Sequence, residues 1–216
     1  ADVLGGSSSG RFGGGSIETQ PDLRKRIANL TSNILNPFCL IIAMILLLSF
    51  VSASSTLDAL KWASVAIALS ILPVFLAMVY LVRKGNLDAV FTNVREQRTQ
   101  LYLLGGFFTV ISYIILAYTG APPILVAGFI TGISTAIIFY CINLWWKISL
   151  HTALVAASAT VLVMLYGWIA VGTVALVPLT GWARIELEYH SLAQAVTGAL
   201  LATLIVVLVF RPLALA

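Results

Sequence analysis

The sequence predicts an all-α protein, a polytopic membrane bundle of about six to seven helices. Two observations lead to this prediction. The chain of 216 residues is 60% hydrophobic and only 9% charged, whereas soluble domains are about one quarter charged. Its apolar residues also fall into long runs separated by polar connections. In hydrocarbon such runs fold as helices, because every backbone polar group needs a hydrogen-bond partner within the segment.

Seven apolar segments follow one another along the chain. They are Phe38–Ala53, Ala59–Val82, Leu101–Tyr118, Ile124–Trp146, Ser149–Tyr166, Ile169–Trp182 and Ser191–Phe210. A membrane-spanning helix takes ~20 residues, and the fifth and sixth segments are shorter than that. We therefore expect these two to form a shallow hairpin or to pack obliquely.

The first part of the chain differs from the rest. Residues 1–16 are rich in Gly and Ser without apolar periodicity, which predicts a disordered tail. No apolar core follows this tail directly, as it would in a secretory signal peptide. Ile17–Asn36 carries Arg24-Lys25-Arg26 and is expected to form a short interfacial helix. Two regions are therefore predicted: the tail and basic interfacial segment (1–36) and a single transmembrane helical domain (37–216).

Seven crossings place the N-terminal region and three connections, Arg83–Gln100, Trp146–Ser149 and Ala183–His190, on one membrane face. All of the 12 Lys and Arg residues except Lys61 and Arg211 fall on that face, so the positive-inside rule predicts that it is cytoplasmic. Membrane topology also explains the net charge of +4. Nucleic-acid binding would require a basic stripe on a polar domain, and we expect none.

Both histidines of the chain lie near cations on this face. Ser149 stands where a helix N-cap is expected, with Lys147 just before it, and the helix dipole there favours an anion. His151 falls in the first turn of that helix, where it is placed to donate a proton to a leaving oxygen. Two histidines without a ligand cluster do not make a metal site, so neither a metal nor a cofactor is predicted. Cys39 and Cys141 are interpreted as packing residues.

A second constellation surrounds the other histidine. Arg184 and His190 are too far around a helix to share a face, so a helix end or loop is expected between them. His190 and Gln194 are four residues apart and are expected to share a helix face. The Gln194 amide can then accept a hydrogen bond from one ring nitrogen and leave the other nitrogen to attack.

These residues resemble the motifs of the type 2 phosphatidic-acid phosphatase superfamily, which are KxxxxxxRP, PSGH and SRxxxxxHxxxD. The matching positions are Arg95–Thr99 in the place of the first motif, Ser149 and His151 in the second, and Arg184, His190 and Gln194 in the third. The resemblance covers about Arg83–Leu204.

The resemblance implies a phosphatidic-acid-phosphatase-like bundle that acts on a membrane lipid or isoprenoid phosphate through a phosphohistidine. Carried over, His190 would be the nucleophile, His151 the general acid, and Gln194 the residue beside the nucleophile. The phosphate ligands would be Ser149, Arg184 and Arg98, with Arg95 or Lys147 in place of the motif's lysine.

The chain also departs from these motifs. Gln194 replaces the aspartate, Ile148 and Leu150 replace the proline and glycine of the second motif, and Phe91 replaces the lysine of the first. Losing a carboxylate beside a catalytic histidine can cost about 10⁴ in rate. The alternative is therefore a catalytically retired relative, serving as a lipid- or pigment-binding or structural subunit among membrane-protein partners. A transporter fits less well, since no inverted repeat is detectable.

Overall fold

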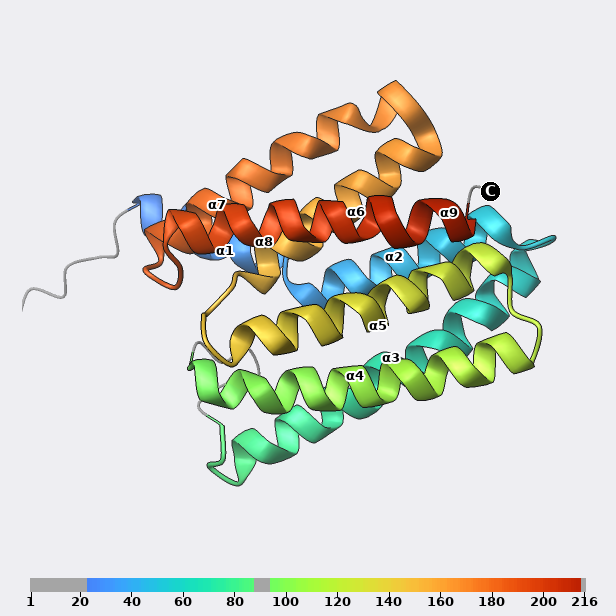
Figure 1. Ribbon diagram of the computed structural model, residues 1–216, viewed down its shortest axis with the longest axis horizontal. Coiled ribbons are helices and arrows are strands. Elements are labelled where there is room, and N and C mark those ends of the chain that lie inside the picture. Colours follow the sequence, from blue (N-terminus) through green and yellow to red (C-terminus); the bar gives the residue numbers. More distant parts are fainter. Residues whose placement is uncertain (1–22, 88–93, 215–216) are drawn as a thin grey trace, which may run out of the picture.

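The computed structural model describes residues 23–87 and 94–214, and all secondary structure in these residues is helical, with no strand (Figure 1). Six helical spans are long and apolar enough to cross a membrane: Leu23–Ser52, Thr56–Arg83, Arg95–Tyr118, Pro123–Asn143, Leu150–Glu186 and Leu192–Ala214. The predicted class, an all-helical membrane-embedded bundle, is therefore confirmed. The predicted tail (1–16) and Phe91 lie outside the described residues.

The elements follow the apolar segments closely. The first half of the chain contains α1 (Leu23–Ile34), α2 (Pro37–Ser52), α3 (Thr56–Arg83), α4 (Arg95–Tyr118) and α5 (Pro123–Asn143). The second half contains α6 (Leu150–Tyr166), the 3-10 helix η1 (Gly167–Ala175), α7 (Leu176–Glu186), α8 (Leu192–Ile205), the π-helix η2 (Val206–Phe210) and α9 (Arg211–Ala214).

The fifth and sixth apolar segments form a hairpin. α6 ends at Gly167, whose φ of +63° lies in the left-handed region that favours glycine. η1 and α7 then carry the chain back along α6, so that both ends of the hairpin lie at the same end of the bundle (Figure 1). By length and composition the run Leu150–Glu186 counts as one span. The six helical runs therefore correspond to the seven apolar segments of the sequence, because the fifth and sixth segments are the two arms of this one hairpin.

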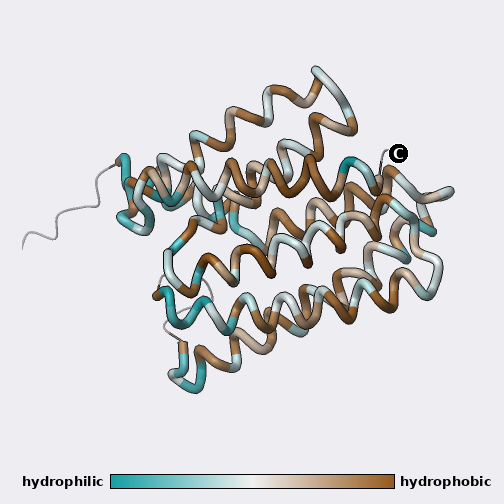
Figure 2. Tube along the Cα trace, in the orientation of Figure 1, coloured by the Kyte–Doolittle hydropathy of each residue, from teal (hydrophilic) through white to brown (hydrophobic). Residues whose placement is uncertain are grey.

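The polar connections gather at one end of the bundle, which we call the polar end. It contains α1, the start of α4, the α5–α6 connection and the α7–α8 connection (Figure 1). Figure 2 shows hydrophilic residues concentrated there and hydrophobic residues along the helices. At the other end, buried side chains from α2, α5, α6 and η2 form an apolar cluster that includes Leu48, Leu125, Phe129, Val161 and Phe210.

α1 lies across the polar end and packs against α7. Its buried positions are Ala28 and Ser32, and its apolar side chains on the other side are exposed: Leu23, Ile27, Leu30 and Ile34. These four recur at helical spacing and form one stripe. A short helix is therefore present within Ile17–Asn36, with one buried face and one exposed apolar stripe, and its position at the membrane interface stays a prediction.

Candidate functional site

The polar end brings together side chains from four separate parts of the chain. Arg98 comes from the first turn of α4, Ser149 and His151 from the start of α6, Arg184 from the last turn of α7, and His190 from the α7–α8 connection. All five are buried, with at most 6% of each residue exposed. Residues 92 positions apart in sequence thus share one interior region.

Hydrogen bonds fix the relative positions of α4, α6 and α8. Arg98 Nη1 donates to the Ile148 carbonyl oxygen at 2.9 Å. The next residue, Ser149, donates its backbone N–H to the Gln194 carbonyl oxygen at 3.2 Å. α8 comes very close here: a Cβ added at Gly198 would lie 2.7 Å from the Ser149 carbonyl oxygen. The second and third motif positions are therefore in direct contact.

Ser149 is the N-cap of α6, as the sequence predicts. Its side-chain oxygen accepts a hydrogen bond from the Thr152 N–H at 3.5 Å, and Leu150 begins the helix. His151 consequently lies in the first helical turn. This geometry places the buried imidazole of His151 beside the positive end of the α6 dipole.

The α7–α8 connection holds the third motif in a folded-back loop. α7 ends at Glu186, and the His190 N–H donates back to the Arg184 carbonyl oxygen at 3.2 Å. The predicted break between Arg184 and His190 is therefore present. Ser191 then caps α8 in a capping box, in which the Ser191 hydroxyl accepts from the Gln194 N–H and the Gln194 side chain accepts from the Ser191 N–H.

The predicted contact between His190 and Gln194 is present, but its cause differs from the expected one. His190 lies outside α8, one residue before the cap, so the two side chains do not share a helix face. Gln194 Oε1 instead accepts from the Ser191 N–H at 3.2 Å and lies 3.0 Å from His190 Nδ1. The capping box, rather than helical spacing, brings the amide to the imidazole.

This arrangement determines which nitrogen of His190 carries the proton. The Gln194 atom that accepts from the Ser191 N–H must be the oxygen, and an oxygen can only accept from Nδ1. Nδ1 therefore bears the hydrogen and Nε2 bears the lone pair. Nε2 is buried and makes no hydrogen bond within the described residues. Such a nitrogen is suited to act as a nucleophile.

Electrostatics keep this imidazole neutral. Burial lowers the pKa of His190 to about 3, and the positive charges of Arg98, Lys147 and Arg184 act in the same direction. The hydrogen bond to Gln194 raises the pKa and offsets only part of this lowering. Burial also lowers the pKa of the half-buried Lys147, with Arg98 and Arg184 contributing. Among the described residues, no ion pair involves Arg98 or Lys147. Cations gathered in this way favour an anion.

α1 contributes a residue to the site that the sequence does not indicate. Arg184 Nη1 donates to the Ser32 hydroxyl at 2.8 Å, and the Arg184 guanidinium lies over the Tyr189 ring at 4.4 Å. Ser32 lies 152 positions before Arg184, and only the packing of α1 on α7 brings them together. The amphipathic pattern of α1 predicts that one of its faces packs against the protein, but it does not predict that this face meets Arg184.

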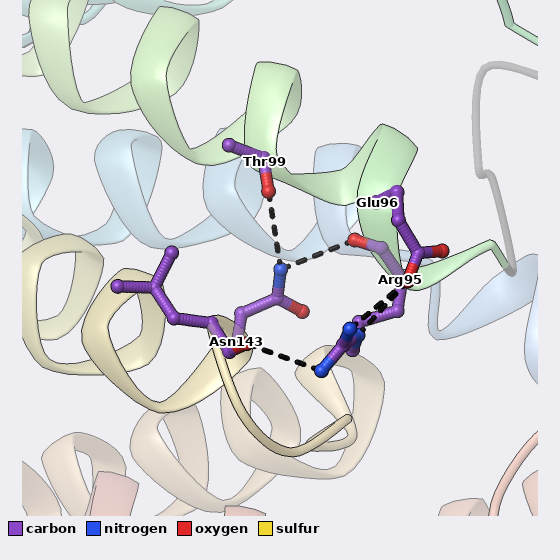
Figure 3. A network of polar contacts seen from close by, with 5 residues as sticks. Arg95, Glu96, Thr99 and Asn143 are labelled. Carbon is purple, nitrogen blue, oxygen red and sulfur yellow. Dashed lines mark hydrogen bonds and ion pairs between the residues drawn. The ribbon is translucent and has the colours of Figure 1, made fainter.

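Arg95 is directed away from this cluster. Its Nε and Nη2 bond to Glu96 Oε1 at 3.1 Å, and its Nη1 donates to the Leu144 carbonyl oxygen at 3.1 Å. Figure 3 shows the same region, where Asn143 also donates to the Arg95 carbonyl oxygen. Arg95 is not among the charges that act on His190. Of the two candidates for the motif's lysine, Lys147 is the one that the structure brings to the cluster.

A cavity of about 290 Å³ begins at the polar end and continues into the bundle. We call it the chamber. Where the chamber begins, Arg98, His151 and Arg184 line it. The remaining lining comes mainly from apolar and small residues of α2, α4, α5 and α6. Composition alone does not predict it, because a cavity arises from the way small residues face one another after packing.

Comparisons with known proteins identify no relative: no protein-family model, curated protein or solved structure matches the chain. Among the described residues, no group of three or more His, Cys, Asp or Glu side chains is placed to hold a metal ion. The site is therefore defined by its chemistry: a cluster of cations around a neutral imidazole, at one end of a membrane-embedded helical bundle.

Proposed function

We propose that the chain hydrolyses or transfers the phosphate of a lipid phosphate monoester or polyprenyl diphosphate through a phosphohistidine on His190. The observation that supports this most is the state of that ring. His190 is neutral, held by Gln194 through Nδ1, and its lone pair on Nε2 lies in a region where Arg98, Lys147 and Arg184 act on it. A phosphate held by these cations would meet a nucleophile.

The proposed reaction assigns one task to each group. Arg98, Arg184, Lys147 and the start of α6 at Ser149 bind the phosphate oxygens. His190 Nε2 attacks phosphorus, a nitrogen–phosphorus bond forms, and the bond from phosphorus to the leaving oxygen breaks.

The proton balance of this reaction requires a second group. In the first step His151 gives its proton to the leaving oxygen, and the negative charge of the bound phosphate favours the imidazolium form that this requires. Water then attacks the phosphohistidine and returns a proton to His151, which releases phosphate and restores His190. With an alcohol in place of water the same second step is a transfer.

A membrane lipid is the proposed substrate class because the site is buried in an apolar bundle. Three of its groups, Arg98, His151 and Arg184, line the chamber, whose remaining lining is largely apolar. A water-soluble phosphate would gain little from such a lining, whereas a lipid phosphate can place its head among the cations and its apolar part below them.

Phosphate release from alkyl and prenyl phosphates by the purified protein tests this proposal. We expect release by the wild-type protein and none by His190→Ala. A labelled phosphate should be trapped on the wild-type chain as an acid-labile, base-stable adduct, since phosphohistidine has these properties. Leu192→Ala, a change at an exposed position of the same turn, is the matched control and should retain release. Equal release by wild type and His190→Ala would refute the mechanism.

Gln194 supports a second candidate function, that of a retired enzyme serving as a lipid- or pigment-binding subunit. An amide orients the His190 ring but cannot stabilise an imidazolium by charge. This candidate predicts that the protein co-purifies with other membrane proteins through its apolar faces. A solitary, monodisperse protein with robust turnover would exclude it.

A further inference from the structure

The chamber extends along the bundle over at least half the thickness of a bilayer. Its lining runs from Arg98 to Thr109 on α4 and from Leu150 to Val161 on α6, which is twelve residues and therefore eleven helical steps in each case. At about 1.5 Å per helical residue, it extends about 16 Å along the bundle. Half the hydrocarbon thickness of a bilayer is about 15 Å. The chamber is thus at least as long as a lipid chain in one leaflet.

The inner wall of the chamber offers few hydrogen bonds to a ligand. The hydroxyls of Ser70, Thr109, Thr131 and Thr135 line it, and each donates its hydrogen to a carbonyl oxygen four residues earlier in its own helix, at 2.6 to 2.8 Å. Ser158 also lines this part, and the other lining residues are glycines, aliphatic residues such as Leu125, or aromatic residues. The chemistry of the wall therefore fits hydrocarbon.

The transition between the polar and apolar parts contains one buried donor. Tyr102 lies one helical turn below Arg98, lines the chamber, and is only 7% exposed. Its hydroxyl makes no hydrogen bond within the described residues. A buried hydroxyl without a partner is costly, and a ligand whose polar head reaches this depth would supply the partner.

We infer that the chamber binds one hydrocarbon chain of an anionic lipid whose head lies against Arg98 and reaches the Tyr102 hydroxyl. The inference rests on the proposed function, since the phosphate is what anchors the head. A volume of about 290 Å³ is at the lower end for ligand pockets, so it holds one chain and not two. At its far end the cluster containing Leu48 and Phe129 closes the chamber and limits the length of the chain.

Gly105 provides the room for this chain. It lines the chamber, and a Cβ built on it meets no atom within 4 Å. On α4 it lies opposite the exposed side chains Leu103, Phe107 and Ile114, because successive residues turn by about 100°. A larger side chain at position 105 would therefore extend into the chamber without displacing the backbone.

The inference is tested by measuring the affinity of two phosphonates for the purified protein in detergent. Ethylphosphonate has a short chain, dodecylphosphonate has a long one, and neither can be hydrolysed. For Gly105→Leu we expect dodecylphosphonate to bind at least about tenfold more weakly than to wild type, the loss of contacts to about two methylene groups. Ethylphosphonate should bind both proteins equally. The long probe also partitions into detergent micelles, but this partition is the same for both proteins and cancels in the ratio of their affinities. Gly172→Leu is the matched control, since position 172 is exposed, lies outside the chamber, and has no atom within 4 Å of a built Cβ.

The outcomes separate this inference from the proposed function. If Gly105→Leu binds both probes as wild type does, the chamber does not hold the chain, whatever the catalytic result. If Arg98→Gln weakens ethylphosphonate but leaves dodecylphosphonate unchanged, head and chain do not belong to one ligand, and the inference is again overturned. If the long probe depends on Gly105 and Arg98 while no phosphate release occurs, the inference stands and the phosphatase proposal fails.

Discussion

His190 and Gln194 are joined by a hydrogen bond of 3.0 Å whose acceptor oxygen also closes the capping box of α8. One amide therefore begins a helix and sets the tautomer of an imidazole. A change at Gln194 affects both, which makes this pair the most informative place to perturb the site.

Gln194→Asp tests whether the site works by charge. We expect turnover of a lipid phosphate to equal or exceed that of wild type, because a carboxylate stabilises the imidazolium and an amide does not. Gln194→Ala removes the acceptor, and the loss of ring orientation should lower turnover about a hundredfold. Steady-state rates and binding of a phosphate analogue measure both effects.

Other results at this position would support the alternative functions of the site. No activity in wild type or Gln194→Asp would indicate a retired site. Lower turnover with analogue binding intact would indicate chemistry adapted to the amide. If rates and binding change in neither variant, Gln194 does not position His190.

Gly198→Ala tests the close approach of α8 to α6. The added Cβ would lie 2.7 Å from the Ser149 carbonyl oxygen and 3.5 Å from Ile148 Cγ1, so backbone must shift. We expect the free energy of unfolding to fall by about 1–3 kcal/mol and turnover to fall with it. Thermal unfolding in detergent measures the first. Gly172→Ala, where the Cβ meets nothing within 4 Å, should leave both unchanged; an equal loss there would show that the contact is not the cause.

The pKa of His190 predicts how stability depends on pH. It is lowered from 6.5 to about 3 in the folded protein, so between these values the unfolded chain binds a proton that the folded chain does not. Stability is then present above pH 6.5 and is lost as pH falls towards 3, with a slope approaching about 1.4 kcal/mol per pH unit. His190→Gln should flatten this part of the profile relative to wild type. Parallel profiles for the two proteins would show that the pKa of His190 is the same in the folded and the unfolded protein.

Ser32→Ala tests the contribution of α1 to the site. The change removes a hydrogen-bond acceptor from the buried guanidinium of Arg184. We therefore expect the free energy of unfolding to fall by about 1–3 kcal/mol. The ion pair of Lys25 with Glu188 joins α1 to the α7–α8 connection at 3.9 Å, with the Glu188 side chain 84% exposed. Glu188→Gln should therefore cost less than about 0.5 kcal/mol. Similar losses for both would mean that surface charges hold α1 in place.

Orientation in the membrane is testable with single cysteines. Trp145 at the polar end is 77% exposed and Tyr118 at the opposite end is 92% exposed. With the exposed Cys39 and Cys141 replaced by serine, Tyr118→Cys should react with a membrane-impermeant maleimide on intact cells. Trp145→Cys should react only after permeabilisation. The reverse pattern would overturn the predicted cytoplasmic position of the site.

The helices and their ends were predictable because their causes are local. Long apolar runs indicate spans, and Ser149 indicates a helix start because its hydroxyl can accept from the first turn. The placement of both histidines at one end also follows from counting spans. The break between Arg184 and His190 was predictable from their spacing.

The remaining features depend on packing between distant segments. Arg95 has many possible anions and carbonyls around it, and the adjacent Glu96 was the sequence signal that it would be engaged elsewhere. Ser32 meets Arg184 only through the docking of α1. The His190–Gln194 contact was predicted, but its origin in the cap of α8 was not, because the helix boundary falls within the motif.

The link from Ser149 to Gln194 also has a consequence for biogenesis. During synthesis, Arg98 and Ser149 enter the bilayer well before the last helix has been made. Only when α8 arrives does the Gln194 carbonyl oxygen receive the Ser149 N–H and its amide orient His190. Incomplete chains therefore carry the cations without the aligned imidazole, and a ribosome stalled before the last helix leaves in the membrane an intermediate in which His190 is not yet oriented.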